Sequence, residues 1–129
     1  MLKKGSRACF SIWGREEFST QFTVTQKAMA NLGKSYPHPP RSNFYLSKDI
    51  GALRSMFVEA GFSADTKIWY QPANWHYRNG QDFANTFVKG REGVTDEAEL
   101  AEVARVYDEE QADGSLKTFE MLMILAYKD

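Results

Sequence analysis

Side chains along residues 7–13 fall into two alternating sets, which is the two-residue period of a β-strand. Two sets of side chains point in opposite directions there: Ala8, Phe10 and Ile12 on one side, and Cys9, Ser11 and Trp13 on the other. Because both sets are fairly apolar, we expect both faces of this strand to be covered. Gly14 follows and ends the strand.

Apolar residues recur at steps of three and four in two later segments, which predicts two amphipathic helices. The stripes are Phe18, Phe22, Thr25, Met29 and Leu32, and then Ile50, Leu53, Phe57 and Ala60. Gly33 and Gly61 follow them as C-terminal caps. For the second helix, we expect Ser47 as the N-cap and Asp49 in the first turn. Between the helices, residues 36–41 form an extended connector with three prolines.

The second half of the chain predicts two more strands and two more helices. Residues 66–77 are rich in strand formers, but Pro72 donates no ladder hydrogen bond, so this strand is at an edge or bulged. Helices follow over residues 80–90 and after Asp96, where Glu99 completes a capping box. Residues 116–127 end in a continuous apolar run, typical of a strand buried on both faces. Periodicity alone also permits a helix there, and the preceding Asp-Gly turn favours the strand.

Composition indicates one small globular domain over residues 1–129, with 43% hydrophobic and 14% aromatic residues. The net charge of −1 argues against nucleic acid as a partner. The single cysteine, Cys9, excludes an internal disulfide and is expected to be a buried, inert thiol in a reducing compartment. Because no run is long enough to span a membrane and no signal peptide is evident, we expect a cytoplasmic protein without a membrane partner.

Two stretches resemble class I S-adenosylmethionine-dependent methyltransferases. "LKKGSRACFSIWG" resembles the segment around the fifth strand of that family, and "LSKDIGALRSMFVEAGF" resembles the helix that leads into the sixth strand. The order of elements resembles the C-terminal half of the family's sheet, in the small-molecule branch that includes the ubiquinone-biosynthesis type. The resemblance implies an α/β fold with a partial mixed sheet of three strands and flanking helices. The last strand would be central and antiparallel, with 66–77 at one edge and 7–13 on the other flank.

The cofactor site of that family has no counterpart in these residues. The family builds it from a Gly-rich loop after the first strand and an acidic residue after the second, whereas no GxGxxG occurs here. We therefore expect the isolated chain neither to bind S-adenosylmethionine nor to catalyse methyl transfer. The cofactor would bind only if a complementing chain supplied its site. The resemblance thus leaves open whether the chain is part of an enzyme.

Five residues are candidates for the methyl-acceptor site, because they lie at or just after the carboxyl ends of two strands, and these ends would lie together if the strands are parallel. They are Trp13, Arg15, Trp75, His76 and Tyr77. The two tryptophans could instead anchor flanking helices, and His76 could be a solvated residue rather than a general base. We expect no metal site, because His38 has no cysteine or acid at ligand spacing beside it.

The alternative function is a non-catalytic module that assembles through its open sheet edge. In the family, a fourth strand pairs with the segment resembling 7–13, and an edge without that strand recruits another chain. We expect a two-fold homodimer, or a complementing methyltransferase half, at this strand. The methyl acceptor and the choice between a subunit, a natural short protein and an incomplete product stay open.

Overall fold

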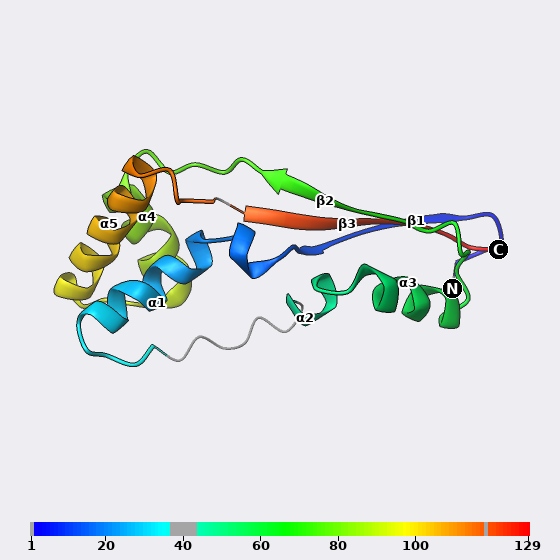
Figure 1. The fold of residues 1–129 in the computed structure, drawn as a ribbon, viewed down its shortest axis with the longest axis horizontal. Coiled ribbons are helices and arrows are strands. Elements are labelled where there is room, and N and C mark those ends of the chain that lie inside the picture. The colour runs from blue at the N-terminus through cyan, green and yellow to red at the C-terminus, as the bar shows by residue number, and fades with distance from the viewer. Residues whose placement is uncertain (1, 37–43, 118) are drawn as a thin grey trace. The chain divides into compact units, whose positions relative to one another are not determined.

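The chain passes twice from a sheet into a group of helices and back (Figure 1). The computed structural model describes residues 2–36, 44–117 and 119–129. The sheet unit consists of Met1–Glu16, Arg41–Ala73 and Phe119–Asp129, and the helical unit of Glu17–Pro40 and Asn74–Thr118. The single domain over residues 1–129 stays a prediction.

The sheet has three strands, β1 (Arg7–Trp13), β2 (Lys67–Ala73) and β3 (Phe119–Tyr127), in the order β1-β3-β2. β3 is antiparallel to both neighbours. This confirms the last strand as the central, antiparallel one, with the Pro72 strand at an edge. A mixed sheet was expected, and this is wrong in one respect. β1 and β2 are parallel to each other but do not pair, because β3 lies between them, so all the strand pairs are antiparallel.

One face of the sheet is covered by two helices, α2 (Phe44–Ser47) and α3 (Ile50–Glu59) (Figure 1). Leu53 of α3 packs there against Leu122 and Ile124 of β3, all of them buried. Partly buried apolar side chains surround this core: Ile12, Leu46, Ile50, Phe57, Ile68 and Tyr70. Burial of the apolar stripe of α3 is therefore what holds this helix to the sheet.

The opposite face of the sheet is less covered than the sequence predicts. Along β3, Leu122, Ile124 and Ala126 are buried, whereas Met121, Met123 and Leu125 are only half-buried. Cys9 is exposed and Trp69 retains 40% of its surface. The expected burial of both faces and the buried Cys9 thiol are therefore wrong. A continuous apolar run in a strand does not show how many of its two faces are covered by helices.

The start of α3 also differs from the prediction. Asp49 is its N-cap, and the Asp49 carboxylate accepts a hydrogen bond from the Ala52 amide at 2.9 Å. Ser47 instead ends α2, where its hydroxyl lies 2.8 Å from the Phe44 carbonyl oxygen. The N-cap position of α3 is two residues later, at Asp49, so Ser47 does not cap this helix. The proline connector and His38 lie mostly outside the described residues.

The helical unit packs α1 (Gln21–Asn31), α4 (Gly80–Phe83) and α5 (Glu97–Ala112) with a π-helix, η2 (Ala84–Glu92). A short 3-10 turn, η1 (Glu16–Phe18), precedes α1. The core is a cluster of buried aromatic rings: Phe22, Tyr77, Phe83, Phe87 and Tyr107. Of the predicted α1 stripe, the middle is buried, whereas Phe18 and Leu32 are about 40% exposed.

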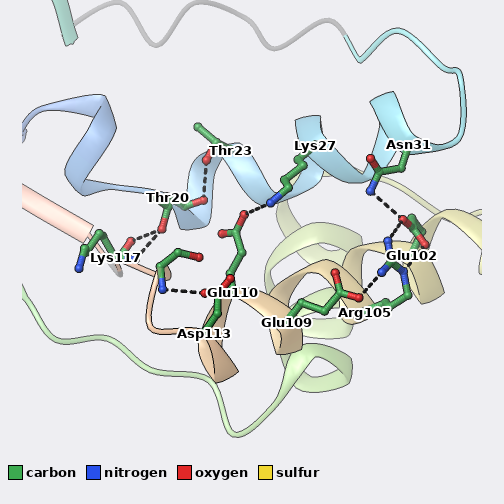
Figure 2. A network of polar contacts seen from close by, with 11 residues as sticks. Thr20, Thr23, Lys27, Asn31, Glu102, Arg105, Glu109, Glu110, Asp113 and Lys117 are labelled. Atoms are coloured by element: carbon green, nitrogen blue, oxygen red, sulfur yellow. Dashed lines mark hydrogen bonds and ion pairs between the residues drawn. The ribbon is translucent and has the colours of Figure 1, made fainter.

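Polar contacts join α1 to α5 (Figure 2). Lys27 Nζ lies 2.9 Å from Glu110 Oε1, and Asn31 Nδ2 donates to Glu102 Oε1 at 3.0 Å. The Arg105 guanidinium, which also bonds Glu102, is the main cause that lowers the pKa of Glu102 to about 2. The predicted cap Asp96 accepts from the amides of Ala98 and Glu99, both at 3.0 Å.

Candidate functional site

A partly buried ion pair closes the end of the sheet beyond β1. Arg15 donates from Nε to Glu120 Oε1 at 2.9 Å and from Nη2 to Glu120 Oε2 at 2.7 Å. The backbone amide of Arg15 donates to the same Oε1 at 2.9 Å. Only 5% of Glu120 is exposed, so its carboxylate depends on these donors for its stability as an anion. The Arg15 guanidinium accordingly holds the pKa of Glu120 below its ordinary value.

The same guanidinium connects to β2 and to α2. It lies 4.1 Å from the centroid of the Tyr70 ring, a cation–π distance. The Tyr70 hydroxyl donates to the Ser47 carbonyl at 2.5 Å. The structure places Arg15 in this network, and its predicted contact with substrate stays a prediction. Arg15 can orient neighbouring residues, but its bidentate contact to Glu120 occupies the fork that would hold a ligand.

Gly14 makes this network possible. A Cβ at position 14 would lie 2.6 Å from Glu120 Cγ, so any larger residue would displace the carboxylate. The Gly14 amide donates to the Glu120 carbonyl at 2.6 Å, and its carbonyl accepts from the Ser47 hydroxyl at 2.6 Å. The glycine after β1 therefore lets the chain turn closely over the start of β3.

Trp13 is the other predicted residue of the sheet unit. It is half-buried, and its ring centroid lies 5.5 Å from that of Phe119 at an interplanar angle of 38°. A shallow pocket of about 410 Å³ lies beside it, lined by Ser11, Ile12, Trp13 and Met121. The pocket runs along the edge of β1, so this edge is both apolar and accessible at its carboxyl end.

The remaining three predicted residues form one segment of the helical unit, held at both ends. The Gln21 side chain donates from Nε2 to the Trp75 carbonyl at 2.8 Å. The Tyr77 amide donates to the Tyr107 hydroxyl at 3.3 Å. His76 lies between these two fixed residues with an exposed side chain. Tyr77 is 8% exposed, and burial raises the pKa of its hydroxyl. It is thus a core residue beneath the segment.

Trp75 presents an aromatic face next to a cation. Half of Trp75 is exposed (50%), and its ring is nearly parallel to Tyr77 at 13°, with centroids 6.4 Å apart. The Arg91 guanidinium lies 5.7 Å from the Trp75 centroid and 5.9 Å from that of Phe87. The helical unit therefore offers an indole face, a guanidinium and the His76 imidazole on one short stretch of chain and its neighbour η2.

The predicted site residues thus divide between the units, with Trp13 and Arg15 in the sheet unit and residues 75–77 in the helical unit. A shared acceptor pocket stays a prediction. Three residues that make these contacts were not predicted from the sequence: Glu120, Gln21 and Arg91. Glu120 had a visible signal, because it is the acid at the start of an otherwise apolar strand. Gln21 and Arg91 had none, since their contacts join segments far apart in sequence.

Comparison with known proteins adds no relative: no protein-family model matches the chain, and no curated protein matches it significantly. Within residues 2–36, 44–117 and 119–129, no helix is long and apolar enough to cross a bilayer. The same described ranges contain no group of three His, Cys, Asp or Glu residues that could hold a metal ion.

Proposed function

We propose that this chain is the acceptor-side half of a small-molecule methyltransferase of the class I S-adenosylmethionine-dependent type. The observation that carries the proposal is the strand order β1-β3-β2 with a central antiparallel β3. The sequence resemblance implies this order for the last three strands of that sheet. Most three-stranded antiparallel sheets connect neighbours in sequence, whereas here the final strand returns between the first two.

The position of the helical unit in the sequence agrees with an acceptor-binding role. The chain leaves the sheet after β1 and again after β2, and both departures lead into that unit. β1 and β2 are parallel to each other, so they end at the same end of the sheet, where open α/β sheets bind ligands. Within the sheet unit we assign acceptor contact to Trp13, supported by Arg15, and within the helical unit to Trp75 and His76, supported by Tyr77.

The cofactor site would lie on a polypeptide segment outside residues 1–129, joined at the outer edge of β1. The Gly14 amide bonds the Glu120 carbonyl and the Lys128 amide bonds the Ser6 carbonyl, in the register that pairs Arg7 with Tyr127. Even-numbered residues of β1 therefore bond to β3. Since ladder bonds alternate along an antiparallel strand, the backbone groups of Arg7, Cys9 and Ser11 point outward. An added strand would pair with these groups.

We expect S-adenosylmethionine to bind only when a cofactor half is present. In calorimetry, the chain alone should show no binding at micromolar concentration, and neither should the isolated cofactor half of a small-molecule class I methyltransferase. The mixture should bind. Ser11→Pro should abolish both association and binding while leaving the fold intact, because proline removes only an outward amide hydrogen.

Ile12→Pro is the matched control, since it removes an amide that bonds to β3 and should unfold the sheet. Micromolar binding by the chain alone would contradict the proposal. So would halves that associate in sedimentation yet bind no cofactor, or an association that Ser11→Pro leaves unchanged.

A second candidate function is assembly of copies through the same edge. The two edges of the sheet differ, because β2 carries Lys67 and Pro72, which discourage pairing, whereas β1 exposes Cys9, Phe10 and Ser11. Among the described residues, no strand pairs with the outer side of β1. Two copies related by a two-fold axis could extend the sheet antiparallel across this edge.

If assembly is the function, sedimentation should show a dimer at micromolar concentration that Ser11→Pro converts to a monomer. Gln71→Lys on the opposite edge strand is the control and should leave the dimer intact. A wild-type monomer throughout this range, or a dimer that persists in Ser11→Pro, would dismiss this candidate.

A further inference from the structure

Charges of opposite sign lie at equal distances from Phe10 along the sequence. Two lysines, Lys3 and Lys4, precede Phe10 by seven and six residues. Glu16 and Glu17 follow it at the same two spacings. Lys4 and Glu16 are both exposed, and neither forms an ion pair with any residue that the structure describes. Charges arranged in this way become complementary when a second copy of the segment runs in the opposite direction.

The backbone of β1 limits how a second copy can pair with it. The outward groups belong to Arg7, Cys9 and Ser11, and among the described residues no strand occupies that side. A two-fold axis perpendicular to the sheet makes the two copies of β1 antiparallel. Because outward groups bond only to outward groups, the axis passes through a residue rather than between two. This leaves three registers near the middle of the strand, with the axis at Cys9, Phe10 or Ser11.

From strand length and charge we infer that two copies pair through β1 with Phe10 on the two-fold axis. In this register all seven residues of β1 are paired, whereas the other two axes overlap only residues 7–11 or 9–13. Longer overlap forms more ladder bonds. The inference rests on the second candidate function, that copies assemble through this edge. The same outward groups would receive a strand from a cofactor half, so the two partners exclude each other.

The three registers also differ in the charges that meet beyond the ladder. With Phe10 on the axis, Lys4 of each copy lies opposite Glu16 of the other, so the attraction occurs twice. An axis at Cys9 would place Lys3 opposite Arg15, and an axis at Ser11 would place Arg7 opposite Arg15. Like charges that face each other across strands are destabilising. Charge therefore favours the same register as strand length.

The Phe10 side chain has exposed surface that this partner would cover. Its ring contacts Phe57 and Phe62, with centroids 5.5 and 6.4 Å away, and 41% of the residue is still exposed. In the inferred register the two Phe10 residues face each other as a non-hydrogen-bonded pair, with Cα atoms about 4.5 Å apart. Contact between the two rings would remove aromatic surface from water in both copies.

The first test is a pair of charge reversals, followed by sedimentation at low salt. Lys4→Glu and Glu16→Lys should each weaken the homodimer roughly tenfold or more, because both symmetric contacts change from attraction to repulsion. An equimolar mixture of the two variants should dimerise like the wild type, since each copy then carries the charges that complement the other. Lys48→Glu and Glu59→Lys, at exposed residues of the sheet unit, are the matched controls and should dimerise like the wild type, alone or mixed.

Disulfide trapping with oxidised glutathione locates the axis independently. In a Cys9→Ser background, Phe10→Cys should form an interchain disulfide, because facing residues of a non-hydrogen-bonded pair lie within disulfide reach. Ala8→Cys in the same background should not, since it would lie opposite Ile12. A dimer that the mixture of reversals does not restore, or that crosslinks through wild-type Cys9 rather than Phe10→Cys, would overturn the inference and leave assembly standing. A wild-type monomer would remove both.

Discussion

Gly80→Ala should destabilise the helical unit more than any other single methyl addition. A Cβ at position 80 would lie 1.9 Å from the Ala104 carbonyl oxygen, which belongs to the backbone of α5 and cannot rotate away. α4 would have to separate from α5, opening the stacked contact between Phe83 and Tyr107 at 4.7 Å. We expect the free energy of unfolding to fall by about 3 kcal/mol or more, measured by urea denaturation with circular dichroism.

Gly90→Ala is the matched control in the same unit. Its nearest neighbour would be the Asn85 carbonyl oxygen at 3.9 Å, an ordinary contact. Because alanine restricts the unfolded chain more than glycine does, this variant should be as stable as the wild type or slightly more so. Equal stability of the Gly80→Ala and Gly90→Ala variants would show that α4 and α5 do not approach as closely as described.

Arg15→Ala should have the second large effect, on the sheet unit. Removing the guanidinium leaves the Glu120 carboxylate buried without its main partner, which costs about 2–4 kcal/mol of unfolding free energy. Arg105→Ala is the control, because the Arg105 pairs with Glu102 and Glu109 are exposed and should contribute less than about 1 kcal/mol. Similar losses in the two variants would contradict the closed network at the sheet end.

The same pair predicts a pH dependence. The pKa of Glu120 is lowered from 4.5 in the folded chain, chiefly by Arg15. Its stabilising contribution is therefore full above the ordinary value and is lost as the pH falls through the lowered pKa. Glu120→Gln should lose less stability than the wild type between neutral pH and about pH 3. An identical acid profile would show that Glu120 contributes nothing to it.

Much of the fold could be predicted from sequence, because local patterns determined it. The alternation in residues 7–13 gave β1, and Pro72 placed β2 at an edge, since proline cannot donate to a ladder. The central position of β3 came from the family resemblance together with its apolar run. The N-cap Asp96 was predicted correctly, because its side chain accepts hydrogen bonds from amides only two and three residues away.

Errors arose wherever the answer depended on contacts between distant segments. Cys9 and Met123 are apolar enough for a core, yet coverage of their face depends on which helices return to it. Ser47 fits an N-cap in sequence, but its hydroxyl bonds the Gly14 carbonyl across 33 residues. The site was affected in the same way. The predicted acceptor contact of Arg15 stays a prediction, and its partner Glu120, 105 residues away, was not predicted at all.

Amide hydrogen exchange along β1 tests the central proposal most directly, that its outer edge receives a strand from a cofactor half. In the dilute chain alone, the amides of Phe10 and Ile12 should exchange slowly, because they bond β3, and those of Cys9 and Ser11 should exchange fast. Adding the cofactor half should slow Cys9 and Ser11 and leave the other two unchanged. Protection of Cys9 and Ser11 already in the dilute chain, or no gain on mixing, would contradict the proposal.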